Sequence, residues 1–125
     1  MNLNQITAPS QDLTISIEFY QRLGLRLIVK ALPKYARFEC PDGDATFSLH
    51  QLGTQPVGNG VVIYFEDEAL DSTVDRLVKA GIKFEELPTA KQWLWREARL
   101  KDPDGNQLIL YQAGKNRKNP HWRIS

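Results

Sequence analysis

The residues with the clearest chemical potential are a histidine and a glutamate, His50 and Glu66, which fall on consecutive candidate strands. A carboxylate beside an imidazole can orient the ring and hold its charge near neutral pH, which suits such a pair to general acid and base catalysis. The same pattern fits a histidine that is only hydrogen-bonded at the end of a strand. Both interpretations stay open, because sequence separation does not establish contact.

Two arginines form a second candidate pair. Arg37 and Arg99 are separated by 62 residues (99 − 37), the same spacing as Pro41 and Pro103 (103 − 41). Each guanidinium can bind a carboxylate or phosphate through two parallel hydrogen bonds, which favours an anionic ligand. The alternative is that nearby carboxylates neutralise both cations inside the fold. The candidates for that role are Glu39, Glu66 and Glu97.

An aromatic segment over residues 93–97, Trp-Leu-Trp-Arg-Glu, is the least generic part of the chain. Its two tryptophans, Trp93 and Trp95, in a loop that enters a strand can form a lid that stacks on a planar ligand, or they can bury a contact between two subunits. Cys40 is the only cysteine, so an internal disulfide and a thiolate metal cluster are excluded. We interpret Cys40 as structural.

Composition limits the possible partners. The chain has 125 residues, of which 42% are hydrophobic, enough for one domain with a real core. Lys and Arg total 16 against 15 Asp and Glu, so a net charge of +1 supplies no broad field for a nucleic acid or an anionic membrane. The first residues carry no targeting pattern, and no apolar run reaches the length of a membrane span. We therefore expect a cytoplasmic protein.

An internal repeat supplies the architecture. Residues 41–44, Pro-Asp-Gly-Asp, and residues 103–106, Pro-Asp-Gly-Asn, both read as tight turns that enter a strand. Upstream of each turn, a glycine, Gly24 or Gly81, closes an amphipathic helical pattern. The order of signals is duplicated, which predicts an α+β fold made of two tandem βαβββ units. The second unit carries five extra residues, between Pro88 and Trp95.

The expected elements follow from apolar periodicity. The first helix starts from an N-cap at Asp12 and buries Leu13, Ile17 and Tyr20, and the second buries Leu70, Val74, Leu77 and Val78. Eight strands are expected near residues 3–8, 25–30, 35–40, 45–52, 60–66, 83–87, 95–101 and 107–112. These elements divide a single domain, 1–125, into a first unit of about 1–53, a linker at 54–59, a second unit of about 60–113 and a tail at 114–125.

Certain residues of this repeat resemble the vicinal oxygen chelate superfamily, which contains glyoxalases, bleomycin-resistance proteins and extradiol dioxygenases. The matching segments are 19–25, Phe-Tyr-Gln-Arg-Leu-Gly-Leu, and 102–106, Asp-Pro-Asp-Gly-Asn, and the resemblance spans about residues 3–112. It implies a curved mixed sheet around one cavity, with both helices on the outer face. It does not imply one reaction, because this superfamily hosts many.

The resemblance also implies where a divalent metal would be bound, on the first and last strands of each unit. The corresponding positions here are Gln5, Ser48, Val62 and Ile109. Only Gln5, together with His50 near Ser48, offers a plausible inner ligand, whereas catalytic sites keep about three protein ligands and an open position. We therefore expect the family metal centre, and any other cofactor, to be absent.

The leading hypothesis is a protein that binds a small anionic or aromatic molecule without that metal. Its expected ligand-binding residues are Gln5, Arg37, Ser48, Tyr64, Trp93, Arg99 and Tyr111, beside the acid/base candidates His50 and Glu66. Two alternatives remain. One is a lyase, isomerase or dioxygenase-like enzyme that uses His50 or a divergent metal site, and the other is a module that binds another protein. The aromatic and aliphatic residues of the tail, Trp122 and Ile124, are expected to contact the body or a second subunit. The resemblance also implies a homodimer.

Overall fold

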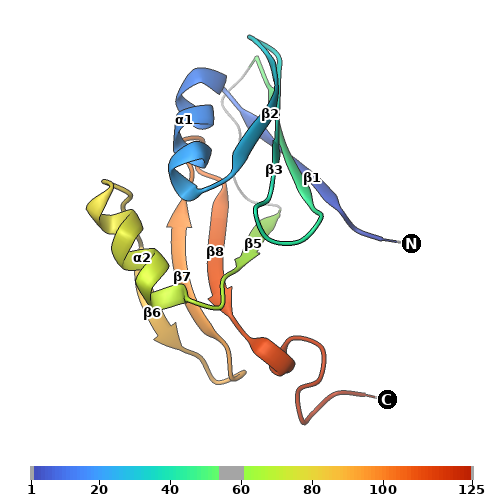
Figure 1. The fold of residues 1–125 in the computed structure, drawn as a ribbon, viewed down its shortest axis with the longest axis vertical. Coiled ribbons are helices and arrows are strands. Elements are labelled where there is room, and N and C mark those ends of the chain that lie inside the picture. Colours follow the sequence, from blue (N-terminus) through green and yellow to red (C-terminus); the bar gives the residue numbers. More distant parts are fainter. Residues whose placement is uncertain (1, 54–60, 125) are drawn as a thin grey trace. The chain divides into compact units, whose positions relative to one another are not determined.

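The computed structural model describes residues 2–53 and 61–124 (Figure 1). The expected linker at residues 54–59 lies outside this range. The chain separates into two compact units, and each holds one four-stranded mixed sheet and one α-helix. The predicted α+β fold of two βαβββ units is therefore confirmed. No helix of the described residues is long and apolar enough to cross a membrane.

The first unit contains β1 (Gln5–Ser10), α1 (Leu13–Leu23), β2 (Arg26–Ala31), β3 (Tyr35–Glu39) and β4 (Thr46–Gln51). Its strand order is β1-β4-β3-β2. The outer strand β1 runs parallel to β4, and the other pairs are antiparallel. The register places Ser48 of β4 between Thr7 of β1 and Arg37 of β3.

Helix α1 decides which face of this sheet is core. The Asp12 side chain accepts hydrogen bonds from the backbone N–H groups of the first turn, and Gly24 ends the helix at φ 111°. Tyr20 on the buried side of α1 packs against Phe38 of β3 and Phe47 of β4. Because side chains alternate along a strand, Tyr35, Arg37 and Ser48 lie on the opposite face.

The second unit repeats this pattern with β5 (Val62–Glu66), α2 (Leu70–Lys79), β6 (Glu86–Ala90), β7 (Arg96–Lys101) and β8 (Gln107–Gln112). Its strand order is β5-β8-β7-β6, and β5 runs parallel to β8. A 3-10 turn, η1 (Gly114–Asn116), follows the last strand. The turn Asp102–Asn106 between β7 and β8 is grouped with the first unit.

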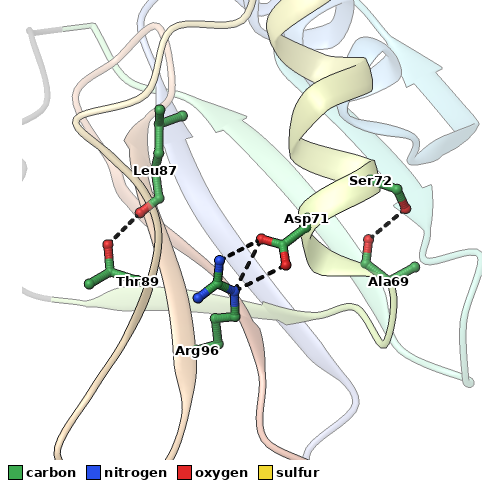
Figure 2. Close-up of polar contacts among 6 residues, drawn as sticks. All are labelled: Ala69, Asp71, Ser72, Leu87, Thr89 and Arg96. Carbon is green, nitrogen blue, oxygen red and sulfur yellow. Dashed lines mark hydrogen bonds and ion pairs between the residues drawn. The ribbon is translucent and has the colours of Figure 1, made fainter.

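A bidentate ion pair between β7 and α2 shows which face of β7 is directed toward the helix. Figure 2 shows Arg96, the first residue of β7, directed at the carboxylate of Asp71 in the first turn of α2. The guanidinium donates through Nε and Nη2 to Asp71 at 2.9–3.2 Å. Arg96 therefore lies on the α2 face of the sheet. Because side chains alternate along a strand, Ala98 lies on the same face as Arg96. Glu97 and Arg99 lie on the other face and point away from α2.

Two details of the expected elements are wrong. The sixth strand runs from Glu86 to Ala90, three residues later than the expected range of 83–87. The backbone N–H of Glu85 already bonds to Arg99, but regular pairing starts only after the chain leaves the turn at Gly81. Val78 is 47% exposed, because it follows the core residue Leu77 and points off the buried stripe of α2.

Candidate functional site

On the first unit, four polar side chains meet on the sheet face that points away from α1. The hydroxyl of Tyr35 lies 2.7 Å from Oγ of Ser48 and accepts a hydrogen bond from Nε of Arg37 at 2.9 Å. Gln5 at the edge of this face accepts a hydrogen bond from the Thr46 hydroxyl at 2.7 Å. The structure therefore brings three of the expected ligand-binding residues, Gln5, Arg37 and Ser48, onto one face, and Ser48 is fully buried there.

The Arg37 guanidinium lies over the aromatic ring of Tyr35, with Cζ 5.4 Å from the ring centroid. The nearby carboxylate of Glu39 pairs with Arg26 instead, at 3.4 Å. No ion pair joins Arg37 to a carboxylate within the described part of the chain. Arg37 therefore keeps its charge available, held in place by a phenol.

The surroundings of Tyr35 make its phenol more acidic than usual. Partial burial raises the pKa of Tyr35, but hydrogen bonds with Ser48 and Arg37 and the charge of Arg37 outweigh this effect, with a further contribution from Gln5. The net pKa of Tyr35 lies below its ordinary value. These neighbours stabilise negative charge on the Tyr35 oxygen.

The acid/base candidates have separate surroundings. His50 is exposed at the end of β4, where it pairs in register with Tyr35 of β3. Glu66 is exposed at the end of β5 in the second unit and lies 3.7 Å from Nε of Arg117. The contact of Glu66 in its own unit is therefore an arginine of the tail.

On the second unit, aromatic side chains gather on the face that points away from α2. The rings of Trp95 and Tyr111 stack, with centroids 4.7 Å apart and an interplanar angle of 19°. Tyr64 meets both rings edge-on, at 6.1 and 5.6 Å. Burial, followed by the nearby charge of Glu66, raises the pKa of Tyr111. This group presents a half-exposed Tyr64 beside a more buried pair of rings.

Arg99 and Glu97 lie on the same side of β7 as these aromatic rings. The Glu97 carboxylate is 3% exposed and accepts a 2.6 Å hydrogen bond from Nε1 of Trp93. Half-buried Arg99 makes no ion pair among residues 2–53 and 61–124. The alternative, in which Glu39, Glu66 and Glu97 neutralise the two arginines, finds no ion pair within the described residues of either unit. The contacts of these carboxylates are Arg26, Arg117 and Trp93, respectively.

The donor set does not fit the metal that the resemblance implies. Within the described residues, no three side chains of the types His, Cys, Asp and Glu group closely enough to hold an ion. Ser48 is engaged by Tyr35, and Ile109 is a buried aliphatic residue. Arg37 pairs in register with Ser48, and its positive charge there would repel a metal ion. Burial and the charge of Asp42 raise the pKa of Cys40, which disfavours a thiolate ligand.

A cavity of about 480 Å³ lies elsewhere on the first unit, at the start of α1. Its wall is formed by Gln11, Asp12, Leu13, Thr14, Leu32, Pro33 and Gln51. None of the expected site residues belongs to this wall. The Asp12 carboxylate already accepts hydrogen bonds from the backbone N–H groups of Thr14 and Ile15. These two N–H groups are therefore not free to bind an anion in the cavity.

Sequence reasoning missed Tyr35, the stacking of Trp95 on Tyr111 and the buried contact of Glu97. Tyr35 lies two residues before Arg37 in the same strand, so the spacing alone predicts that the two side chains share a face. The stacking of Trp95 on Tyr111 needed the β7–β8 register, in which Glu97 pairs with Tyr111. The sequence did not supply that register.

Comparison with known proteins agrees with this architecture. A sequence model of the Glyoxalase/Bleomycin resistance protein/Dioxygenase superfamily matches residues 2–110, which run from before β1 into the last strand, β8. The chain belongs to this superfamily, and the resemblance seen in the sequence is confirmed.

Individual relatives have diverse descriptions. The uncharacterized protein YraH of Bacillus subtilis (strain 168) is 29% identical over 126 residues, which cover 90% of this chain and 98% of YraH. A bleomycin-binding protein, solved in complex with bleomycin, has a TM-score of 0.72 and 21% identity, covering 90% of this chain and 98% of that one. Lactoylglutathione lyase from Agrobacterium tumefaciens has a TM-score of 0.71 and 20% identity, covering 89% and 92%, respectively. Similarity to solved structures at 20–21% sequence identity shows the fold alone.

Proposed function

We propose that this protein binds a small anionic or aromatic molecule without the family metal centre. The observation that carries the proposal is the pair of repeat-related arginines, Arg37 and Arg99. Each lies half-buried on the sheet face that points away from its helix, and neither has a carboxylate partner among the described residues. A half-buried guanidinium without a counterion favours an external anion, because the pairing restores the charge balance.

The aromatic group of the second unit supports the other half of the proposal. Stacked and edge-on rings offer a flat apolar surface, and Tyr64 remains half-exposed at its border. A planar ligand that also carries a carboxylate or phosphate uses both kinds of recognition. The bleomycin-binding protein with this fold supports a role in binding, by analogy.

The absence of a metal is part of the proposal. The four positions that the resemblance assigns to ligands hold Gln5, Ser48, Val62 and Ile109. Arg37, the register partner of Ser48, supplies a fixed positive charge in that region. Recognition then depends on a guanidinium, which binds oxyanions at any physiological pH because it stays protonated.

An enzymatic function remains the alternative, in which His50 performs acid/base chemistry. The lyase with this fold favours it by analogy. The contacts within each unit support this alternative less, because the contact of Glu66 is with Arg117 and not with a histidine. We also propose a homodimer. Trp122 and Ile124 of the tail are 50% and 89% exposed, so they are available to a second subunit.

Calorimetric titration against a panel of small carboxylates and phosphates tests the proposed function. We expect the parent protein to bind members of the panel and Arg99→Met to bind them about tenfold more weakly, with a nearly unchanged melting temperature. The matched control is Arg96→Met, three residues earlier on β7, whose guanidinium serves the Asp71 ion pair. It should keep the affinity. A parent protein that binds no member of the panel rejects the proposal.

A further inference from the structure

The hydroxyl of Tyr35 is the centre of the polar group on the first unit. It contacts Ser48 on β4 and Arg37 on its own strand, at 2.7 and 2.9 Å. The Tyr35 ring also lies beneath the guanidinium. Any anion that approaches the outer nitrogens of Arg37 therefore comes close to the Tyr35 oxygen.

The contacts decide how the hydroxyl proton is used. A phenol oxygen accepts up to two hydrogen bonds and donates one. Arg37 can only donate. Ser48 is completely buried, and its hydroxyl has Tyr35 as its side-chain partner within the described structure. A buried hydroxyl that fails to donate costs free energy, so the favoured arrangement has Ser48 donating to Tyr35. The proton of Tyr35 then points toward the amide of Gln5, the third side chain that hydrogen-bonds to this phenol, and toward a ligand that displaces that amide.

We propose that Tyr35 and Arg37 together form an oxyanion site, in which the guanidinium and the protonated phenol both donate to one carboxylate or phosphate group. The inference rests on the proposed function and adds a residue, a ligand class and a pH limit to it. Ionised Tyr35 would have no proton to donate and would itself neutralise Arg37. The site therefore loses affinity for anions as the pH rises through the pKa of Tyr35.

The charged groups around Tyr35 agree with this direction. Arg37 favours the phenolate, and the pKa of Tyr35 lies below its ordinary value. Glu39 on the same strand is paired with Arg26 of β2. His50 of β4 is the register partner of Tyr35. The other residues that face this group have no titratable side chain. They are Gln5 and Thr7 of β1 and Val29 and Ala31 of β2.

Binding and proton release are linked through this site. An anion that prefers the protonated phenol must raise the pKa of Tyr35 when it binds. Affinity should then be constant below the pKa of the ligand-free phenol and fall above it. That fall starts below pH 10, the usual tyrosine range, because Arg37 and Ser48 lower the pKa of the free protein.

The test uses benzoate and phenyl phosphate as probes, titrated by calorimetry from neutral to alkaline pH. Tyr35→Phe keeps the ring beneath Arg37 and removes only the hydroxyl. We expect about fivefold to tenfold weaker binding at neutral pH and the loss of the alkaline decline. His50→Gln separates the histidine from this effect, because the decline should persist in that variant. Preference for one probe distinguishes a carboxylate site from a phosphate site.

A second readout follows the phenol itself by ultraviolet absorbance. Tyr35→Phe should remove an ionisation step that precedes those of Tyr20 and Tyr111, whose pKa values burial raises. Ser48→Ala should move the Tyr35 step, and the loss of anion affinity, to higher pH. If the parent protein binds neither probe, the proposed function fails. If the parent binds them and Tyr35→Phe keeps both the affinity and its alkaline decline, the proposed function stands and this inference is overturned.

Discussion

The hydroxyl of Tyr20 donates a 2.6 Å hydrogen bond to Oδ2 of Asp102, which lies 82 residues later in the chain. Tyr20 is completely buried in α1, and Asp102 opens the turn between β7 and β8. The same turn binds α1 a second time, because Asp104 accepts from the Ser16 hydroxyl at 2.7 Å. This turn of the second repeat therefore stabilises the first unit.

Tyr20→Phe tests the strength of that contact. The ring stays in the core, but a largely buried carboxylate loses one of its donors. Hydrogen bonds to charged groups contribute about 1.5–3 kcal/mol, so we expect a loss of unfolding free energy in that range. Chemical denaturation measures it. A loss below about 0.5 kcal/mol would show that Asn106, which also donates to Asp102, compensates.

Asp102 also gives the protein a specific acid response. Burial raises the pKa of Asp102 above its ordinary 3.8, against the opposing effect of hydrogen bonds from Tyr20 and Asn106. The folded state thus binds this proton more tightly than the unfolded state. The contribution of Asp102 to the free energy of unfolding is therefore fully present below pH 3.8. It is lost as the pH rises through the raised pKa of the folded state. Comparing the pH dependence of unfolding for Asp102→Asn with that of the parent isolates the contribution, which should be absent in the variant.

Trp93 has a structural role in addition to any role as a lid. Its indole N–H is the hydrogen-bond donor to the buried carboxylate of Glu97, and its ring is 44% exposed. Trp93→Phe and Trp93→Ala should both lower stability by about 1.5–3 kcal/mol, because both remove this donor. If the ring covers a ligand, only Trp93→Ala should also weaken the binding of benzoate. Glu97→Gln is the control, since it keeps an acceptor for the indole. Equal affinities in all three variants would reject the lid.

The protein should carry no stoichiometric transition metal when it is purified without chelator. The reason is that Val62 and Ile109 provide no lone pair, and Arg37 places a positive charge beside Ser48. Elemental analysis decides this directly. About one zinc, nickel, manganese or iron per chain, lost on His50→Ala, would mean that a divergent ligand set exists.

The fold was predictable because its signals are local and occur twice. The cap at Asp12, the turn at Gly24 and the buried stripe that contains Tyr20 each follow from a few neighbouring residues. The sixth strand was misplaced by three residues because pairing with β7, and not its own composition, determines where regular hydrogen bonding begins. Tertiary contacts override such weak local preferences.

The site was only partly predictable, for the same reason. Arg37 and Ser48 share one face of the sheet because they are register partners and the period of a strand fixes which side chains share a face. The partners of the glutamates depend on strand register and on a tail whose path has no periodic signal. Arg117 of that tail contacts Glu66, a pairing that no spacing rule suggests.

The most direct measurement is calorimetric titration of the parent protein with benzoate and phenyl phosphate, before and after treatment with a chelator. The central claim is that a fixed guanidinium group, tested here on Arg37 of the first unit, recognises an anion without a metal. We expect at least one probe to bind with an affinity that the chelator leaves unchanged, and Arg37→Met to weaken that affinity about tenfold. Binding that disappears with the chelator and returns with an added divalent metal would contradict the claim.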